Sequence, residues 1–92
     1  MSHVVVRLPA ALRPFADGAA ELHVPAGTLA DVIRSTGERH PQLPARLLTP
    51  EGTLRPLVNV FVGRDNVRDL QGLGTVVADG AEVFILPAVA GG

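Results

Sequence analysis

The sequence lacks two residue types with reactive side chains, cysteine and lysine. Without cysteine the chain forms no disulfide, has no thiolate nucleophile and cannot bind a metal through sulfur. All eight basic residues are arginines, so the N terminus of Met1 is the only amine. Because nine acidic residues leave a net charge of −1, the charge gives no reason to expect a nucleic acid or an anionic membrane as a partner.

Long apolar runs are also absent. No segment approaches the roughly 18 apolar residues of a membrane span, and the start of the chain lacks the charged and apolar regions of a signal peptide. We therefore expect a cytoplasmic protein without a membrane partner. Its 92 residues, 47% of them hydrophobic, predict a single domain with one modest core.

The hydrophobic pattern predicts short strands around one main helix. This helix is expected to begin after Thr28, a good N-cap with Asp31 three residues later, and to end by His40. A turn at 16–18 joins the first two strands into a hairpin, and a further helical turn is expected at 43–48. Strands are expected at 3–8, 20–24, 57–62, 67–69 and 82–86.

This order of elements is typical of the β-grasp fold, an α+β class in which a mixed sheet curls around one main helix. We expect the first and last strands to pair in parallel at the centre of the sheet, through a right-handed crossover. The domain then spans residues 1–87, and residues 88–92 form a flexible tail that projects from it. Five extended residues reach about 16 to 18 Å, which is enough to enter the active site of another protein.

The chain ends in the segment ILPAVAGG, whose last residues are Gly91 and Gly92. Glycine has no Cβ, so its backbone passes through slots too narrow for other residues. The only reactive group at this end is the Gly92 carboxylate, a poor electrophile that becomes reactive once it is phosphorylated or adenylated. We therefore interpret the tail as a substrate handle, with Gly92 as the reacting residue. The residues that another enzyme would bind are Ala88, Val89, Ala90 and Gly91.

The segment LQGLGTVVADGAEVFILPAVAGG resembles the C-terminal signature of the ThiS/MoaD family of ubiquitin-like sulfur carrier proteins. The shared features are a leucine and glycine, an Asp-Gly turn, an apolar strand, a proline and a final Val-Ala-Gly-Gly. The resemblance extends along the whole chain but is most specific in this segment. The matching positions are Leu70, Gly72, Leu73, Thr75, Asp79, Gly80, Glu82, Val83, Ile85, Pro87, Val89, Ala90, Gly91 and Gly92.

Within the family, the segments ILPAVAGG, ALRPFADG and RLLTPEG are most similar to the CysO-type carriers of cysteine biosynthesis. Molybdopterin-type and thiazole-type members often have proline and aspartate where this chain has Ala88 and Ala81. The resemblance therefore favours the cysteine branch over those two.

The resemblance also implies a mechanism and a set of partners. An E1-like adenylyltransferase/sulfurtransferase consumes ATP to adenylate Gly92, and delivery of sulfur converts the carboxylate to a thiocarboxylate. A cysteine synthase dependent on pyridoxal phosphate (PLP) accepts the sulfur, and a metalloprotease releases the product. The carrier itself binds no cofactor, and it is a co-substrate rather than an enzyme.

One face of the strand at 57–62 holds candidate contacts for these partners. If the valines of this strand pack on the helix, Leu57, Asn59 and Phe61 face outward, either as an apolar docking patch or as edge packing. Three arginines are candidates for steering an acidic partner: Arg13, Arg64 and Arg68. The three histidines lie on different elements without ligand spacing, so we expect no metal site: His3, His23 and His40.

Other functions stay open from the residues alone. The chain could carry sulfur for a secondary metabolite, molybdopterin or thiazole. It could be a ubiquitin-like modifier conjugated to lysines of other proteins, although without lysine it cannot build chains on its own side chains. It could also be a β-grasp interaction module whose glycines are incidental.

Overall fold

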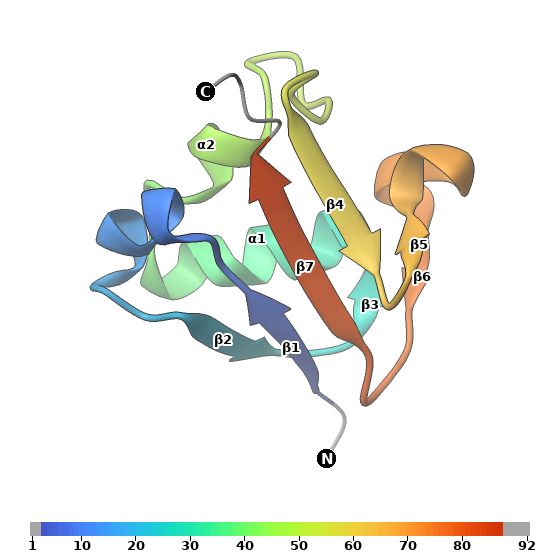
Figure 1. Cartoon of the computed structure of the whole chain (residues 1–92), viewed down its shortest axis with the longest axis horizontal. Helices are drawn as coiled ribbons and strands as arrows, with labels where there is room; N and C mark the ends of the chain where they lie inside the picture. Colours follow the sequence, from blue (N-terminus) through green and yellow to red (C-terminus); the bar gives the residue numbers. More distant parts are fainter. Residues whose placement is uncertain (1–2, 88–92) are drawn as a thin grey trace.

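The computed structural model describes residues 3–87, which form a curved sheet with one main helix across one face (Figure 1). The strand order in this sheet is β2-β1-β7-β4-β5, and β3 and β6 form a separate two-stranded pair. Short 3₁₀ helices, labelled η, join several of the strands. In chain order the elements are β1 (Val4–Arg7), η1 (Ala10–Ala16), β2 (Glu21–Val24), β3 (Gly27–Thr28), α1 (Leu29–Arg39), α2 (Pro44–Leu47), β4 (Val58–Val62), β5 (Asp65–Asn66), η2 (Val67–Asp69), η3 (Gly72–Gly74), β6 (Val76–Val77) and β7 (Glu82–Pro87).

The first and last strands lie side by side at the centre of the sheet (Figure 1), as the sequence predicts. β1 and β7 are parallel, in a register that runs from Val5 opposite Glu82 to Arg7 opposite Phe84. β2 pairs with β1 and β4 pairs with β7, both antiparallel. The predicted β-grasp arrangement, a mixed sheet around one main helix, is confirmed.

A reciprocal capping box starts α1 where the sequence predicts it. The Thr28 backbone N–H donates to the Asp31 carboxylate at 3.1 Å, and the Asp31 N–H donates to the Thr28 hydroxyl at 3.2 Å. Two otherwise unpaired donors of the first turn are thereby satisfied. The helix ends at Arg39, with His40 as its C-cap.

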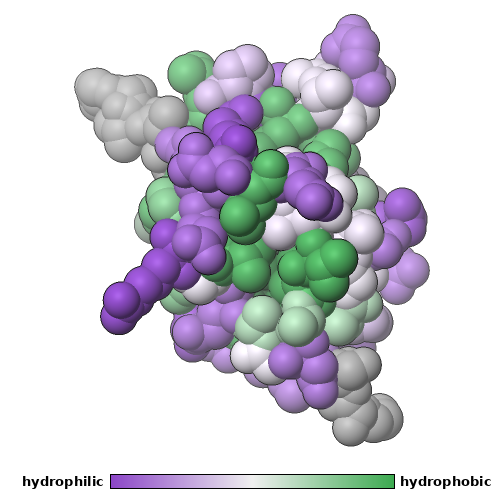
Figure 2. All heavy atoms as spheres, turned by 90° about the vertical axis from the view of Figure 1, so that its right-hand side faces the viewer, coloured by the Kyte–Doolittle hydropathy of each residue, from purple (hydrophilic) through white to green (hydrophobic). Residues whose placement is uncertain are grey.

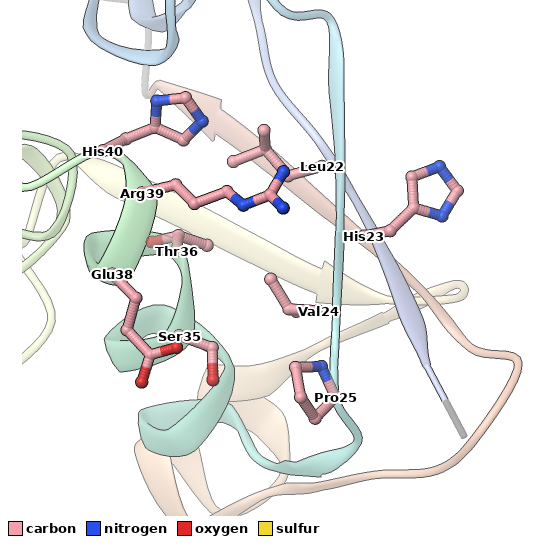
Figure 3. Close-up of a pocket in the computed structure, with 9 residues that line it drawn as sticks. All are labelled: Leu22, His23, Val24, Pro25, Ser35, Thr36, Glu38, Arg39 and His40. Atoms are coloured by element: carbon pink, nitrogen blue, oxygen red, sulfur yellow. The ribbon is translucent and has the colours of Figure 1, made fainter. Parts of the chain in front are cut away.

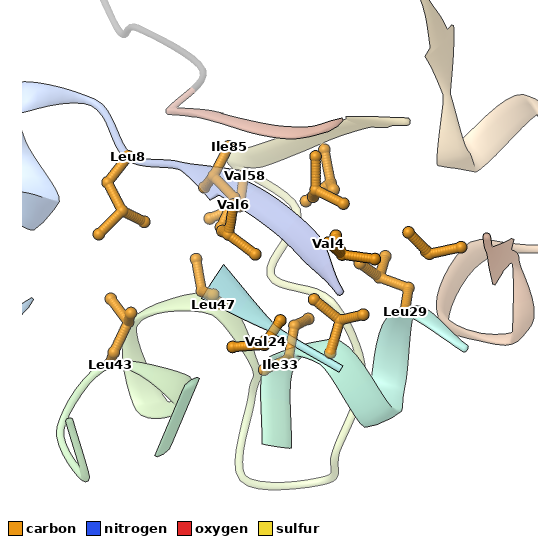
Figure 4. Packing of buried hydrophobic residues seen from close by; sticks show 14 of the residues in the cluster. Val4, Val6, Leu8, Val24, Leu29, Ile33, Leu43, Leu47, Val58 and Ile85 are labelled. Atoms are coloured by element: carbon orange, nitrogen blue, oxygen red, sulfur yellow. The ribbon is translucent and has the colours of Figure 1, made fainter. Parts of the chain in front are cut away.

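Alternating side chains of the central strands form the core. Val4 and Val6 of β1, Val60 of β4 and Val83 of β7 are fully buried. Figure 4 shows this cluster packed between the sheet and α1, with Leu29 and Ile33 on the helix side. Burying each such side chain contributes about 1.5 to 3 kcal/mol relative to leaving it exposed. Because side chains alternate along a strand, the intervening residues face the opposite side of the sheet.

Helix α1 also approaches α2 closely, at Gly37. A Cβ placed on Gly37 would lie 2.7 Å from Cγ of Pro44. The glycine that weakens the helix is therefore the residue that allows α2 to pack on it.

Two connections differ from the expected ones. The segment 67–69, expected to be a short return strand, is the 3₁₀ helix η2, and the return strand is β5, two residues earlier. Asn66 starts η2 because its side-chain oxygen accepts from the Arg68 N–H at 2.9 Å. In the first hairpin, the predicted turn is present, with positive φ at Asp17 and Gly18, but η1 precedes it.

Within residues 3–87, none of the helices has both the length and the apolar character needed to span a bilayer.

Candidate functional site

The site is built around the C-terminal half of β7, the strand that leads to residue 88. From Val83 to Pro87, each β7 residue has a register partner on β4, ending with Pro87 opposite Val58. The pairing with β1 stops earlier, at Phe84 opposite Arg7. Pairing with β4 therefore fixes the backbone of β7 as far as Pro87, the last described residue. The predicted reactive and partner-binding residues of the tail, Ala88, Val89, Ala90, Gly91 and Gly92, lie outside the described residues.

The outer face of the sheet, the one away from α1, carries an apolar surface at this end of β7. Phe61 lies opposite Phe84, and Asn59 lies opposite Leu86. Leu57, in the turn just before β4, is 69% exposed and Leu86 is 46% exposed. We call this set the docking surface: Leu57, Asn59, Phe61, Phe84 and Leu86.

Sequence reasoning found only part of this surface. It named the three residues on one strand, Leu57, Asn59 and Phe61, and the half-exposed position of Phe61 agrees with the expected outward face. It missed Phe84 and Leu86, although these alternate with the buried Val83 and Ile85. That alternation was the signal that could have found them.

An ion-pair network lies beside the docking surface. The Arg7 guanidinium donates from Nε to Glu82 at 2.8 Å and from Nη1 to Glu21 at 3.0 Å. The hydrogen bond to Glu82 raises the pKa of Arg7 above its ordinary value, and Glu21 adds to this effect. All three side chains are over 40% exposed, so these pairs stabilise the fold only slightly. Their main consequence is that the cation beside Phe84 is already neutralised.

Two of the three arginines considered for steering a partner instead bind the protein's own backbone. Arg13 donates from Nε to the carbonyl of Leu8 at 3.2 Å. Arg68 donates from Nη2 to the carbonyls of Arg55 and Val58, at 2.8 and 2.7 Å. Arg64 makes no hydrogen bond or ion pair within residues 3–87, so of the three it is the one with a free charge.

The histidines do not assemble a metal site in the described part of the chain. The rings of His3 and His23 lie 5.4 Å apart, closer than their separation in sequence suggests. His40 lies elsewhere, 3.6 Å from the carboxylate of Asp17. Within residues 3–87 no three histidine, aspartate or glutamate side chains cluster as ligands.

A second apolar area lies on another side of the molecule. Figure 2 looks at the side formed by β5 and β6, where apolar side chains are interrupted by polar ones. Two exposed residues belong to this region, Leu70 at 47% and Val76 at 73%. Because Val76 is on β6, outside the main sheet, it is a suitable control position for tests of the docking surface.

A β-grasp domain with its last strand central in the sheet and an apolar outer face beside the end of that strand defines a class, the ubiquitin-like proteins. The chain belongs to the ThiS family, whose model matches residues 6–92.

Similar proteins of known structure or role support this assignment. The sulfur carrier protein CysO of Mycobacterium tuberculosis is 39% identical over 92 residues, covering 98% of this chain and 99% of the relative. The structure of the Amycolatopsis orientalis BexX/CysO complex contains a chain with a TM-score of 0.91 and 37% identity, covering 97% of this chain and 99% of that one. Small archaeal modifier protein 3 of Haloferax volcanii is 38% identical over 65 residues, covering 71% of this chain and 70% of the relative.

These similarities confirm the resemblance drawn from the C-terminal segment. The chain is a small ubiquitin-like carrier protein of the sulfur carrier type, and it is not an enzyme.

Proposed function

We propose that this protein carries sulfur as a thiocarboxylate on Gly92 and delivers it to an acceptor enzyme of cysteine biosynthesis. The observation that carries the proposal is the full-length similarity to a sulfur carrier protein, combined with a sequence that ends in Gly-Gly five residues after the central strand β7. A chain without cysteine needs a main-chain group for sulfur chemistry, and the terminal carboxylate is such a group.

The chemistry takes place at the terminal carbonyl carbon. The Gly92 carboxylate attacks the α-phosphorus of ATP on an E1-like enzyme, which forms an acyl adenylate and releases pyrophosphate. A sulfur donor at the oxidation level of sulfide then displaces AMP and leaves a thiocarboxylate. In contrast to a cysteine thiol, whose ionisation depends on its surroundings, this group is anionic at neutral pH without assistance from the protein.

The acceptor step follows from the nucleophilic sulfur. The thiocarboxylate adds to an aminoacrylate held by a PLP-dependent cysteine synthase, and an acyl shift from sulfur to nitrogen leaves cysteine in an amide bond to Gly92. A metalloprotease hydrolyses this bond, which releases cysteine and restores the carboxylate. A chain in a complex named BexX/CysO is similar to this one, which supports a partner protein as the acceptor. Sulfur transfer to an acceptor of another pathway is the alternative.

The docking surface has the properties of a contact for these enzymes. Four of its five residues are apolar, and it lies on β4, on β7 and in the turn before β4, beside the paired residues Val58 and Pro87. Two of its side chains, Leu57 and Leu86, are exposed. Exposed apolar patches of this kind mark protein interaction sites. A partner bound there would have residue 88 within reach.

Modification of other proteins is a second candidate, because one relative is a small archaeal modifier protein. Intact mass spectrometry separates the two after incubation with an E1-like enzyme, ATP and sulfide. An exchange of one oxygen for sulfur supports the carrier, whereas conjugates to lysines of other proteins support the modifier. As a positive control, the same enzyme is shown in parallel to activate a known carrier. If the mass of this protein is unchanged under those conditions, both functions are refuted.

A further inference from the structure

The free edge of the sheet opposite β5 belongs to β2 (Figure 1). The Leu8 N–H donates to the carbonyl of Ala20, and the Val5 N–H donates to Ala81 on the other side of β1. Since backbone groups alternate in direction along a strand, Leu22 and Val24 bond to β1, whereas the N–H and C=O of Glu21 and His23 point away from the sheet. Within residues 3–87 these outward groups have no backbone partner.

A groove of about 420 Å³ lies between this edge and α1. Leu22, Val24 and Pro25 line one side, and the buried Thr36 lies on the helix side (Figure 3). The side chains of Glu21 and His23 belong to the outer face of the sheet, so they leave the edge itself open. The groove therefore offers unpaired backbone groups beside an apolar lining.

Two oppositely charged side chains line the groove: Arg39, the last residue of α1, and Glu38 beside it. Figure 3 shows the Arg39 guanidinium extended across the groove toward Leu22, whereas the Glu38 carboxylate turns toward Ser35. Arg39 makes no hydrogen bond or ion pair in the described part of the chain. The nearby Glu21 carboxylate is already bound by Arg7 and His23, at 3.0 and 3.1 Å. A positive charge is thus left without a partner beside the open edge.

We propose that this groove binds an extended, acidic segment of a partner protein as an additional strand on β2. The backbone of the segment pairs with Glu21 and His23, an apolar side chain covers Leu22, and a carboxylate binds Arg39. Main-chain pairing with an edge strand supplies affinity, and the alternate side chains supply specificity. Because β2 and the docking surface on β4 and β7 are separated by β1, both can be occupied together.

The strand has only four residues, so the binding is weak and reversible. We expect a dissociation constant between about 0.1 and 1 mM for a short peptide. Such a contact suits recruitment by a partner that engages the carrier transiently, and it does not depend on sulfur transfer.

The test is an amide chemical-shift titration of the ¹⁵N-labelled full chain with the blocked peptide acetyl-Thr-Ile-Thr-Asp-Thr-amide. Its isoleucine and aspartate are two positions apart and therefore share the face that meets Leu22 and Arg39. We expect perturbations centred on the amides of Glu21, His23 and Arg39, and not on β4. Arg39→Glu is expected to weaken binding about fivefold or more, whereas Arg64→Glu, a matched change of a free arginine outside the groove, leaves it unchanged. N-methylation of the central threonine amide removes a backbone donor that faces β2 without changing charge and should also weaken binding.

Three results would overturn the proposal. One is the absence of perturbation at about 2 mM peptide, another is equal weakening by the Arg39 and Arg64 variants, and the third is a perturbation map centred on the docking surface. Analytical ultracentrifugation of the free protein tests the other possible occupant of the edge, a second copy of the chain. If the free protein is a dimer and Arg39→Glu or His23→Pro dissociates it, the edge is assigned to a second copy instead.

Discussion

The Nη2 atom of Arg68 donates a hydrogen bond of 2.7 Å to the carbonyl of Val58, the first residue of β4. The same nitrogen also donates to the carbonyl of Arg55, at 2.8 Å. Arg68, which lies in η2, thereby links the turn that contains Leu57 to the start of β4. Part of the docking surface thus depends on a residue that lies outside it.

Arg68→Ala should lower the free energy of unfolding by about 1 kcal/mol, because two backbone carbonyls lose a charged donor. Arg68→Lys should restore only part of the loss, since one ammonium replaces a planar guanidinium. Urea denaturation measures both variants, with Arg64→Ala as the control. Equal stabilities of the Arg64 and Arg68 variants would show that these bonds do not hold the turn.

Leu57→Asp should weaken docking without affecting folding. The side chain is 69% exposed, so the change costs little stability, but it places a charge in an apolar surface. We expect the KM of adenylation by the E1-like enzyme to rise about tenfold or more, with kcat nearly unchanged. Val76→Asp, equally exposed but off the main sheet, should leave the KM unaltered. A similar rise in KM for both variants would contradict the assignment of the surface.

Deletion of Gly92 should abolish sulfur transfer and leave thermal stability almost unchanged. The residue is predicted to react but not to support the fold, so the two measurements should separate. Intact mass after the activation reaction and a thermal melt of the same sample provide the readouts. A large fall in melting temperature would contradict the predicted projecting tail.

The capping box should make stability depend on pH. Hydrogen bonds from Thr28, with a contribution from Arg34, hold the pKa of Asp31 below its ordinary value of 3.8. A depressed pKa stabilises the fold fully above the ordinary value and loses that effect as the pH falls through the folded value. Wild type should therefore exceed Asp31→Asn in stability at neutral pH, and the difference should shrink in acid.

Denaturation at a series of pH values measures this difference, with Glu51→Gln, in an exposed turn, as the control. A difference between wild type and Asp31→Asn that stays constant down to the lowest pH would show that the ionised carboxylate does not contribute.

Gly37→Ala should destabilise the protein although alanine favours helix by up to about 1 kcal/mol. The added Cβ would lie 2.7 Å from Cγ of Pro44, and a proline ring has little freedom to move. Glu38→Ala, at the next and exposed position, controls for propensity. A Gly37→Ala variant more stable than wild type would mean that α2 shifts at little cost.

Local patterns predicted the main elements well. Thr28 and Asp31 define the start of α1 through bonds that span three residues, and the alternation of Val58, Val60 and Val62 is typical of a strand with one buried face. The failure at 67–69 has a physical cause. Residues 67–69 were expected to form a short return strand after the turn, but the Asn66 side chain accepts a hydrogen bond from the Arg68 N–H and the chain continues as a 3₁₀ helix.

The site was predicted only in part, because it is made by pairs of residues distant in the chain. Phe61 lies opposite Phe84 and Asn59 opposite Leu86 only once β4 and β7 have adopted their register. No local pattern sets that register, and none shows that Arg13 and Arg68 bind carbonyls of their own chain.

The sequence by itself determined the fold class, the capped helix and the Gly-Gly end with its carboxylate, because these follow from side-chain periodicity, short-range hydrogen bonds and covalent structure. Only the tertiary structure decided which apolar residues join into one surface and where the arginine charges are free. It also decided which strand edge is open. These depend on strand order and register, which are settled by long-range packing rather than by neighbouring residues.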